Sequence, residues 1–228
     1  MHFLARLSAA SLLAAFTLGA HAAYDANLIV NGDAESGVSG WTAYAGTPLF
    51  IADKYSSNWV TPTQPGPTDR GSNLFVGGSV SYAAGYQVFD FSGHQGDISA
   101  GLVSYSLSGW LGGWSSQDDN AMVYVTFLDG LGNLVGEASL GPVMAADRGN
   151  ATGVYFREDS GLVPTTAASA VLALSMERKA SSDNDGYADN LFFSISAVPE
   201  PGTYALMLFG LAAVGAAARR AKRPAAQA

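Results

Sequence analysis

The chain has 228 residues, of which 11 are basic and 19 acidic, so its net charge is −8, and it contains no cysteine. The negative charge disfavours nucleic acid and anionic membranes as partners. The lack of cysteine excludes disulfides and cysteine nucleophiles, and the sequence contains neither an HExxH zinc motif nor a phosphate-binding P-loop. The few basic residues far from the termini, such as Arg148, are expected to pair with neighbouring carboxylates.

The first 22 residues predict a secretory signal peptide. Arg6 supplies the positive charge, residues 7–18 form an apolar helical stretch, and an Ala-His-Ala tripeptide ending at Ala22 provides the small residues of a cleavage site. An uncleaved anchor helix is the alternative, which those small residues disfavour. The mature chain is therefore expected to begin at Ala23.

Residues 23–197 predict one all-β domain. Short apolar or alternating runs are separated by turn residues, which is typical of strands with one buried face. About nine strands at this spacing indicate a jelly-roll-like β-sandwich. The run at 170–176 is apolar on both faces, so a short buried helix is an alternative there; we choose a strand because its neighbours are strands. The predicted strands cover residues 28–30, 41–44, 73–77, 84–92, 102–110, 122–129, 134–140, 152–157, 170–178 and 187–196.

An Asp-rich stretch at the last predicted strand predicts a calcium site. Calcium takes about six to eight oxygen ligands. Asp183, Asp185 and Asp189 supply carboxylates densely, and Gly186 permits a tight turn between them. The spacing is not that of an EF-hand, because the twelfth position counted from Asp183 is Ser194 and not a glutamate. An Asp/Asn turn solvated by water is the alternative.

The opening of the domain carries a second acidic group. Residues 31–35 read Asn-Gly-Asp-Ala-Glu, and Gly-Trp follows at 40–41. This pattern resembles the opening of jelly-roll carbohydrate-binding modules and other galactose-binding-like domains. The resemblance implies that Glu35 and Asp189 lie at a structural calcium ion, which clips the two ends of the domain together. Asp33 and Glu35 therefore join the predicted metal ligands.

A polar loop with aromatic residues predicts ligand binding. Aromatic rings stack on the C–H faces of sugars, while amides and carboxylates bond to sugar hydroxyls. Two alternatives stay open: the tryptophans plug the end of the sandwich, or Asp118 and Asp119 bind a second calcium ion. Trp59, Tyr82 and Tyr86 are weaker candidates for stacking. The predicted ligand-binding residues are Trp110, Trp114, Gln117, Asp118, Asp119 and Asn120.

The C-terminal segment, residues 198–228, predicts a sorting signal and a membrane anchor. The peptide Val198-Pro199-Glu200-Pro201 is stiff and extended, because proline fixes its own φ and restricts the preceding residue. Residues 203–218 are apolar and favour a single transmembrane helix; the basic cluster at 219–223 extends the span and favours the cytoplasmic side. A buried core helix is the alternative.

The order of these C-terminal elements resembles the PEP-CTERM sorting signal of Gram-negative bacteria. The resemblance implies an exported protein, held in the inner membrane and processed by an exosortase near the Pro-Glu-Pro. Its place is then the cell surface or the extracellular matrix, in association with exopolysaccharide. Our leading hypothesis is a non-enzymatic, glycan-binding protein with structural calcium. A structural matrix component that binds itself or other proteins is the alternative, and a glycoside hydrolase is disfavoured because no acid/base pair is recognisable.

Overall fold

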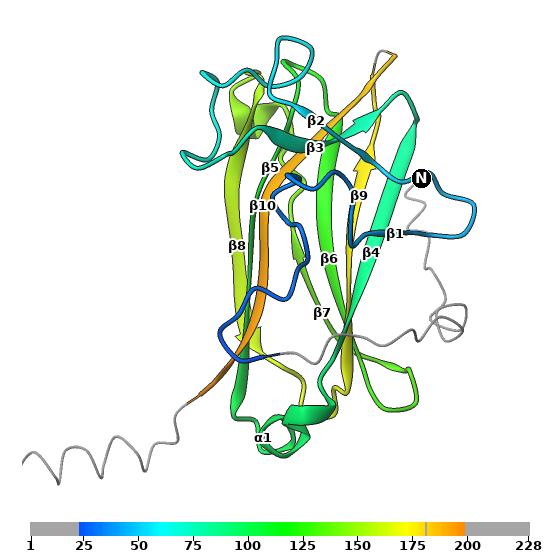
Figure 1. Ribbon diagram of the computed structural model, residues 1–228, viewed down its shortest axis with the longest axis vertical. Coiled ribbons are helices and arrows are strands. Elements are labelled where there is room, and N and C mark those ends of the chain that lie inside the picture. Colours follow the sequence, from blue (N-terminus) through cyan, green and yellow to red (C-terminus); the bar gives the residue numbers. More distant parts are fainter. Residues whose placement is uncertain (1–22, 181, 199–228) are drawn as a thin grey trace, which may run out of the picture.

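The computed structural model describes residues 23–180 and 182–198, which form a β-sandwich of two five-stranded antiparallel sheets. Figure 1 shows the long strands running along the long axis of the domain, with the short helix α1 (Gln95–Ser99) at one end. The predicted all-β sandwich is therefore confirmed. The first sheet contains β1 (Thr42–Ala43), β4 (Tyr82–Asp90), β9 (Ser169–Glu177), β6 (Asn120–Leu128) and β7 (Leu134–Leu140), in that order. The second contains β2 (Ile51–Lys54), β3 (Asn73–Gly78), β10 (Asn184–Ala197), β5 (Val103–Gly113) and β8 (Gly153–Leu162).

Alternating apolar residues place one face of each sheet in a shared core. On β6, Val123, Val125 and Phe127 are buried, whereas the residues between them point outward. The ring centroid of Phe127 lies 5.4 Å from that of Tyr105 on β5 and 6.4 Å from that of Phe193 on β10. These aromatic contacts hold the two sheets together, and they fix which face of each strand remains outside.

The strands differ from the sequence prediction mainly near the beginning of the domain. Residues 28–30 lie in an irregular segment that bends into a turn and do not form a strand, although Leu28 N–H donates to the Phe193 carbonyl at 2.7 Å. The Asn27 side chain replaces further strand pairing, since its amide oxygen accepts Phe193 N–H and its nitrogen donates to the Leu191 carbonyl. The short strand β2 was not predicted, and β8 continues five residues beyond the predicted end at 157.

A second, smaller apolar cluster lies on the outer side of the second sheet, under the loop 55–72. Arg70 fixes this loop by donating to the carbonyls of Pro67, Thr61 and Gln64, and its guanidinium lies 5.1 Å from the centre of the Tyr55 ring. The loop therefore serves as a cover for part of the sheet. The buried members of the cluster are Tyr55, Val60, Leu74, Val76, Val154 and Tyr187, with Trp59, Trp110 and Trp114 packed against them.

The last strand, β10, lies in the middle of its sheet between β3 and β5. It ends at Ala197, and Val198 N–H still donates to the Leu102 carbonyl at 2.8 Å, so the domain extends to the start of the predicted sorting motif. The predicted signal peptide (1–22), the residues Pro199, Glu200 and Pro201, and the predicted transmembrane helix (203–218) lie outside the described residues. Within the described part of the chain, no helix has the length and apolar character needed to cross a bilayer.

Candidate functional site

The outward face of the first sheet carries a group of tyrosines. Tyr86 on β4 lies opposite Ala173 on β9, and Ala173 in turn lies opposite Tyr124 on β6. Tyr82 lies on the same face of β4, and its side chain and that of Tyr124 are 43% and 42% exposed. Two strands therefore present aromatic rings on either side of a strand with a small side chain.

A fourth tyrosine extends this face toward β1. The Tyr44 ring lies 4.7 Å from the Tyr86 ring, measured between centroids, at an interplanar angle of 40°. Burial, with the nearby Tyr82 and Tyr86, raises the pKa of Tyr44 to about 12. Burial also raises the pKa of Tyr124, so both phenols stay protonated at physiological pH and remain hydrogen-bond donors. We call Tyr44, Tyr82, Tyr86, Tyr124 and the intervening Ala173 the tyrosine face.

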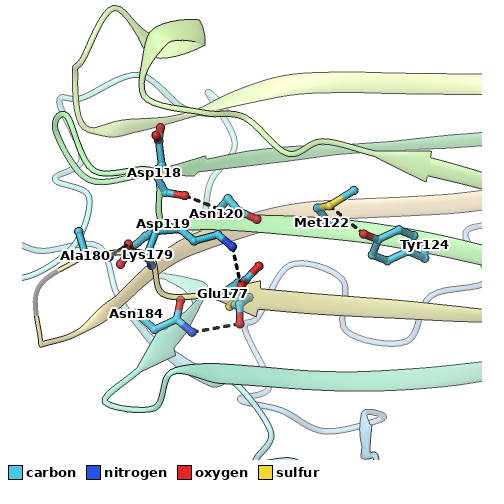
Figure 2. Close-up of polar contacts among 10 residues, drawn as sticks. Asp118, Asp119, Asn120, Met122, Tyr124, Glu177, Lys179, Ala180 and Asn184 are labelled. Carbon is cyan, nitrogen blue, oxygen red and sulfur yellow. Dashed lines mark hydrogen bonds and ion pairs between the residues drawn. The ribbon is translucent and has the colours of Figure 1, made fainter. Parts of the chain in front are cut away.

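Polar residues border the tyrosine face at one end. Glu177, the last residue of β9, lies between Tyr82 on β4 and Asn120 on β6. Its carboxylate forms an ion pair with the Lys179 ammonium at 2.5 Å, and both side chains are nearly half exposed. Figure 2 shows this end of the face, with Tyr124 and Met122 on β6 and Glu177 at the end of β9. The face therefore combines aromatic rings with an exposed acceptor and an exposed donor.

Asp119, a predicted ligand-binding residue, is instead fully buried and holds the loops behind this end. One carboxylate oxygen accepts Lys179 N–H at 2.6 Å and Ala180 N–H at 2.8 Å (Figure 2). The other oxygen accepts Asp185 N–H at 3.0 Å. Asn120 is 6% exposed and donates to the Asp118 carbonyl. Asp119 therefore positions the loop that bears Lys179, and both side chains present little surface to a ligand.

The other predicted ligand-binding residues have packing or loop contacts of their own. Trp110 and Trp114 are half-buried against the second apolar cluster, and the Trp110 ring lies 5.7 Å from that of Phe156 in an edge-on arrangement. Gln117 is half-buried and accepts Arg148 through its carbonyl, while Asp118 is exposed and accepts Ala145 N–H. The tryptophans therefore have a packing role, and only part of each ring remains accessible.

The first loop and the last strand meet, as the resemblance implied. Leu191 N–H donates to the Gly32 carbonyl at 2.9 Å. Asp189 on β10 is fully buried, and its carboxylate accepts the Tyr55 hydroxyl at 2.5 Å and Asn190 N–H at 2.8 Å. Burial raises the pKa of Asp189 to about 7, with smaller contributions from the charges of Asp33 and Glu35. These acidic groups are therefore near one another in space.

The predicted metal ligands fall into two separate groups. Asp33 and Glu35 line an open depression of about 560 Å³ beside Asp189, and one Glu35 oxygen accepts the N–H groups of Ser72 and Asn73. Asp185 lies elsewhere on β10, where its carboxylate accepts the Tyr187 hydroxyl at 2.6 Å. Burial, with the charges of Asp119 and Asp183, raises the pKa of Asp185. Within residues 23–180 and 182–198, no three acidic or histidine side chains come together as a ready metal cage.

Tyr82 and Tyr86 were predicted only as weaker candidates for stacking, and Tyr44 and Tyr124 were not predicted. A local signal for Tyr124 is present, since alternation puts it on the opposite side of β6 from the buried Val123 and Val125. The pairing that brings these tyrosines to one face has no local signal.

Comparison of the sequence with known families matches one motif. The PEP-CTERM protein-sorting motif matches residues 197–223. It confirms the predicted sorting segment that begins near Val198 and implies an exported protein, anchored in the membrane before processing. No curated protein sequence matches the chain.

Comparison of the structure finds several similar β-sandwiches. A family 16 carbohydrate-binding module is 21% identical with a TM-score of 0.50, and the match covers 73% of this chain and 99% of the module. TmCBM61 in complex with β-1,4-galactotriose is 14% identical with a TM-score of 0.45, covering 74% and 97%. The enzymatically active domain of bacteriophage CBA120 tailspike protein 4 is 18% identical with a TM-score of 0.46, covering 74% of this chain and 21% of that one. The chain therefore carries a PEP-CTERM protein-sorting motif behind a β-sandwich whose fold is similar to that of a carbohydrate-binding module.

Proposed function

We propose that this exported protein binds a glycan on its tyrosine face. The observation that carries the proposal is the row Tyr86–Ala173–Tyr124, in which two aromatic residues flank a small one. Neighbouring strands are about 4.8 Å apart, so the backbones of Tyr86 and Tyr124 are separated by about 10 Å. A sugar ring over Ala173 has room to contact the rings on both sides.

The chemistry of the face suits a sugar. Aromatic rings pack against the apolar C–H faces of pyranoses, and protonated phenols donate hydrogen bonds to their oxygens. Glu177 and Lys179 add an acceptor and a donor for hydroxyl groups at the end of the same face. The proposed role is binding and not catalysis, because Glu177 is paired with the Lys179 ammonium, whereas glycosidase mechanisms use a pair of carboxyl groups that flank the scissile bond. The proposed ligand is a glycan of the exopolysaccharide matrix, because the sorting motif implies that the protein is exported.

Replacing Tyr124 with alanine is expected to weaken glycan binding about tenfold, because it removes one wall of the proposed site. The measurement is native affinity electrophoresis of the full-length chain in detergent, in gels that contain the matrix polysaccharide of the producing cell. Phe156→Ala is the matched control, since Phe156 is 46% exposed but lies on the opposite sheet. Equal retardation of wild type and Tyr124→Ala would assign binding to another surface.

We also propose that calcium binds where the first loop meets β10. The carboxylates of Asp33, Glu35 and Asp189 have the hard oxygen chemistry that calcium prefers, and the carbonyls of the first loop would have to complete the ligand set. Calcium is therefore expected to raise the melting temperature relative to EDTA, by an amount that grows with its concentration. Asp33→Asn is expected to abolish this rise. Magnesium serves as the control ion, and identical melting curves in calcium and EDTA would exclude the site.

A further inference from the structure

The sorting motif leaves the domain at the end that carries α1. Val198 N–H donates to the Leu102 carbonyl at 2.8 Å, and Leu102 N–H donates at 2.9 Å to the carbonyl of Asp97 in α1. Figure 1 shows the end of β10 and α1 at the same end of the sandwich. Four residues separate Val198 from the predicted membrane segment, which starts at residue 203. An extended chain spans at most about 3.6 Å per residue, so the anchor holds this end within about 20 Å of the bilayer.

Two other connections belong to the same end of the sandwich. The turn between β6 and β7 adjoins Ala168, whose N–H donates at 2.7 Å to the carbonyl of Leu128, the last residue of β6. The Ala167 carbonyl in turn accepts the side-chain amide of Gln95 in α1 at 3.0 Å. We call residues 92–102, 129–134 and 162–168 the α1 end.

Three leucines are exposed at the α1 end. Leu131 and Leu134, at the turn between β6 and β7, are 83% and 52% exposed, and Leu162, the last residue of β8, is 61% exposed. Among the exposed large apolar side chains of the described residues, Leu131 and Leu162 have the highest exposed fractions. Exposed apolar surface concentrated at one end of a domain indicates an interaction surface, and the partner nearest to this end is the bilayer that holds the sorting segment.

The charges at the α1 end decide which kind of bilayer surface fits it. This end carries the carboxylates of Asp97 and Asp129 and contains neither lysine nor arginine. An anionic headgroup would therefore meet like charges and no cation to pair with. Apolar contact with an uncharged headgroup region is favourable, because it removes leucine surface from water.

We propose that Leu131, Leu134 and Leu162 dock the α1 end onto the uncharged surface of the bilayer in which the sorting segment is anchored. This docking rests on the membrane anchoring that the sorting motif implies and does not depend on glycan binding. The anchor keeps the leucines at a high local concentration beside the bilayer, so a contact too weak to bind a free domain suffices. The long strands then stand upright on the membrane, and the tyrosine face on their flank stays open to the matrix (Figure 1).

The test places one fluorescent label at each end of the domain. The chain has no cysteine, so a single introduced cysteine takes the fluorophore NBD at one position. Gly130→Cys labels the turn beside Leu131, where an added Cβ meets no atom within 4 Å. Ser116→Cys labels an exposed loop that follows β5 at the opposite end. Each full-length chain is reconstituted into phosphatidylcholine vesicles and recovered with them by flotation. The label at position 130 is expected to emit at shorter wavelength than the label at 116, and lipids with a spin label near the headgroup are expected to quench only the former.

Leu131→Ser combined with Leu134→Ser, in the chain labelled at 130, is expected to abolish this quenching. Phe156→Ser is the matched control and is expected to leave it unchanged, because Phe156 is 46% exposed but lies away from the α1 end on β8. Equal quenching at 130 and 116, or quenching that survives the two serine substitutions, would overturn the docking. A shift to shorter wavelength without quenching by lipid would place the turn against a second copy of the chain and would also overturn it. A chain that does not float with the vesicles would overturn the anchoring and the docking with it, while leaving the proposed glycan binding intact.

Discussion

Replacing Arg148 with methionine is expected to lower the free energy of unfolding by about 4 kcal/mol. Arg148 is 3% exposed, and its guanidinium donates to four backbone carbonyls of two loops. Methionine fills much of the space but leaves those buried acceptors without a donor, and each lost bond to a charged group is worth about 1.5–3 kcal/mol. The carbonyls belong to Gly113, Ser115, Gln117 and Ala151.

The measurement is denaturant unfolding followed by tryptophan fluorescence. Arg157→Met is the matched control, because the Arg157 guanidinium donates to the carbonyl of its neighbour Phe156 in an exposed position; its effect is expected to stay within about 0.5 kcal/mol. Arg148→Lys keeps the charge but loses the planar fork, so it is expected to recover only part of the stability. If Arg148→Met were as stable as Arg157→Met, the carbonyls would not depend on this side chain.

The hydrogen-bond partners of Arg148 differ from those that its residue type predicts. In an acidic domain the expected partner of an arginine is a carboxylate, yet in the described part of the chain its hydrogen bonds go to backbone carbonyls. Asp119 differs in the opposite direction. An acidic residue in a loop is expected to be exposed, but Asp119 is buried, and its carboxylate accepts three backbone N–H groups. Which backbone groups need a side-chain partner depends on how two loops approach each other, and the sequence pattern does not contain this information.

The longer strands were predictable because their alternation is a local property. In β5, Val103, Tyr105 and Leu107 are buried and the serines between them are not, and the same period marks β6. Strands β1 and β2 have only two and four residues. The strand predicted at 41–44 covers β1, but β2 forms because β3 offers an edge to pair with, so no sequence pattern of its own predicts it.

The tyrosine face was not predictable for a related reason. Alternation shows that Tyr82, Tyr86 and Tyr124 point out of their strands, but not which strand lies between them. The row forms because β9, more than forty residues later in the chain than β6, inserts between β4 and β6. Register and strand order decide this site, and both depend on long-range pairing.

Asp189 is expected to make the stability of the domain fall as the pH rises from about 4 to about 7. Its pKa is raised to about 7 in the folded state, mainly by burial, against about 3.9 in an unfolded chain. The folded state therefore holds a proton over this interval that the unfolded state has lost. Stability is fully present below the unfolded pKa and declines until the folded pKa is passed, by up to about 4 kcal/mol.

Asp189→Asn is expected to remove this slope and to be more stable than wild type above pH 7. Asparagine mimics the protonated acid, because its oxygen still accepts a hydrogen bond and its nitrogen can donate to the Tyr55 hydroxyl. The measurement is denaturant unfolding across pH in EDTA, with Asp97→Asn as the control: Asp97 also accepts a tyrosine hydroxyl, that of Tyr24 at 2.8 Å, but in an exposed position. Parallel curves for wild type and Asp189→Asn would mean that Asp189 is charged throughout. Divergence only for Asp189→Asn would show that the strand meeting the first loop carries a neutral acid, which calcium would have to deprotonate before it binds.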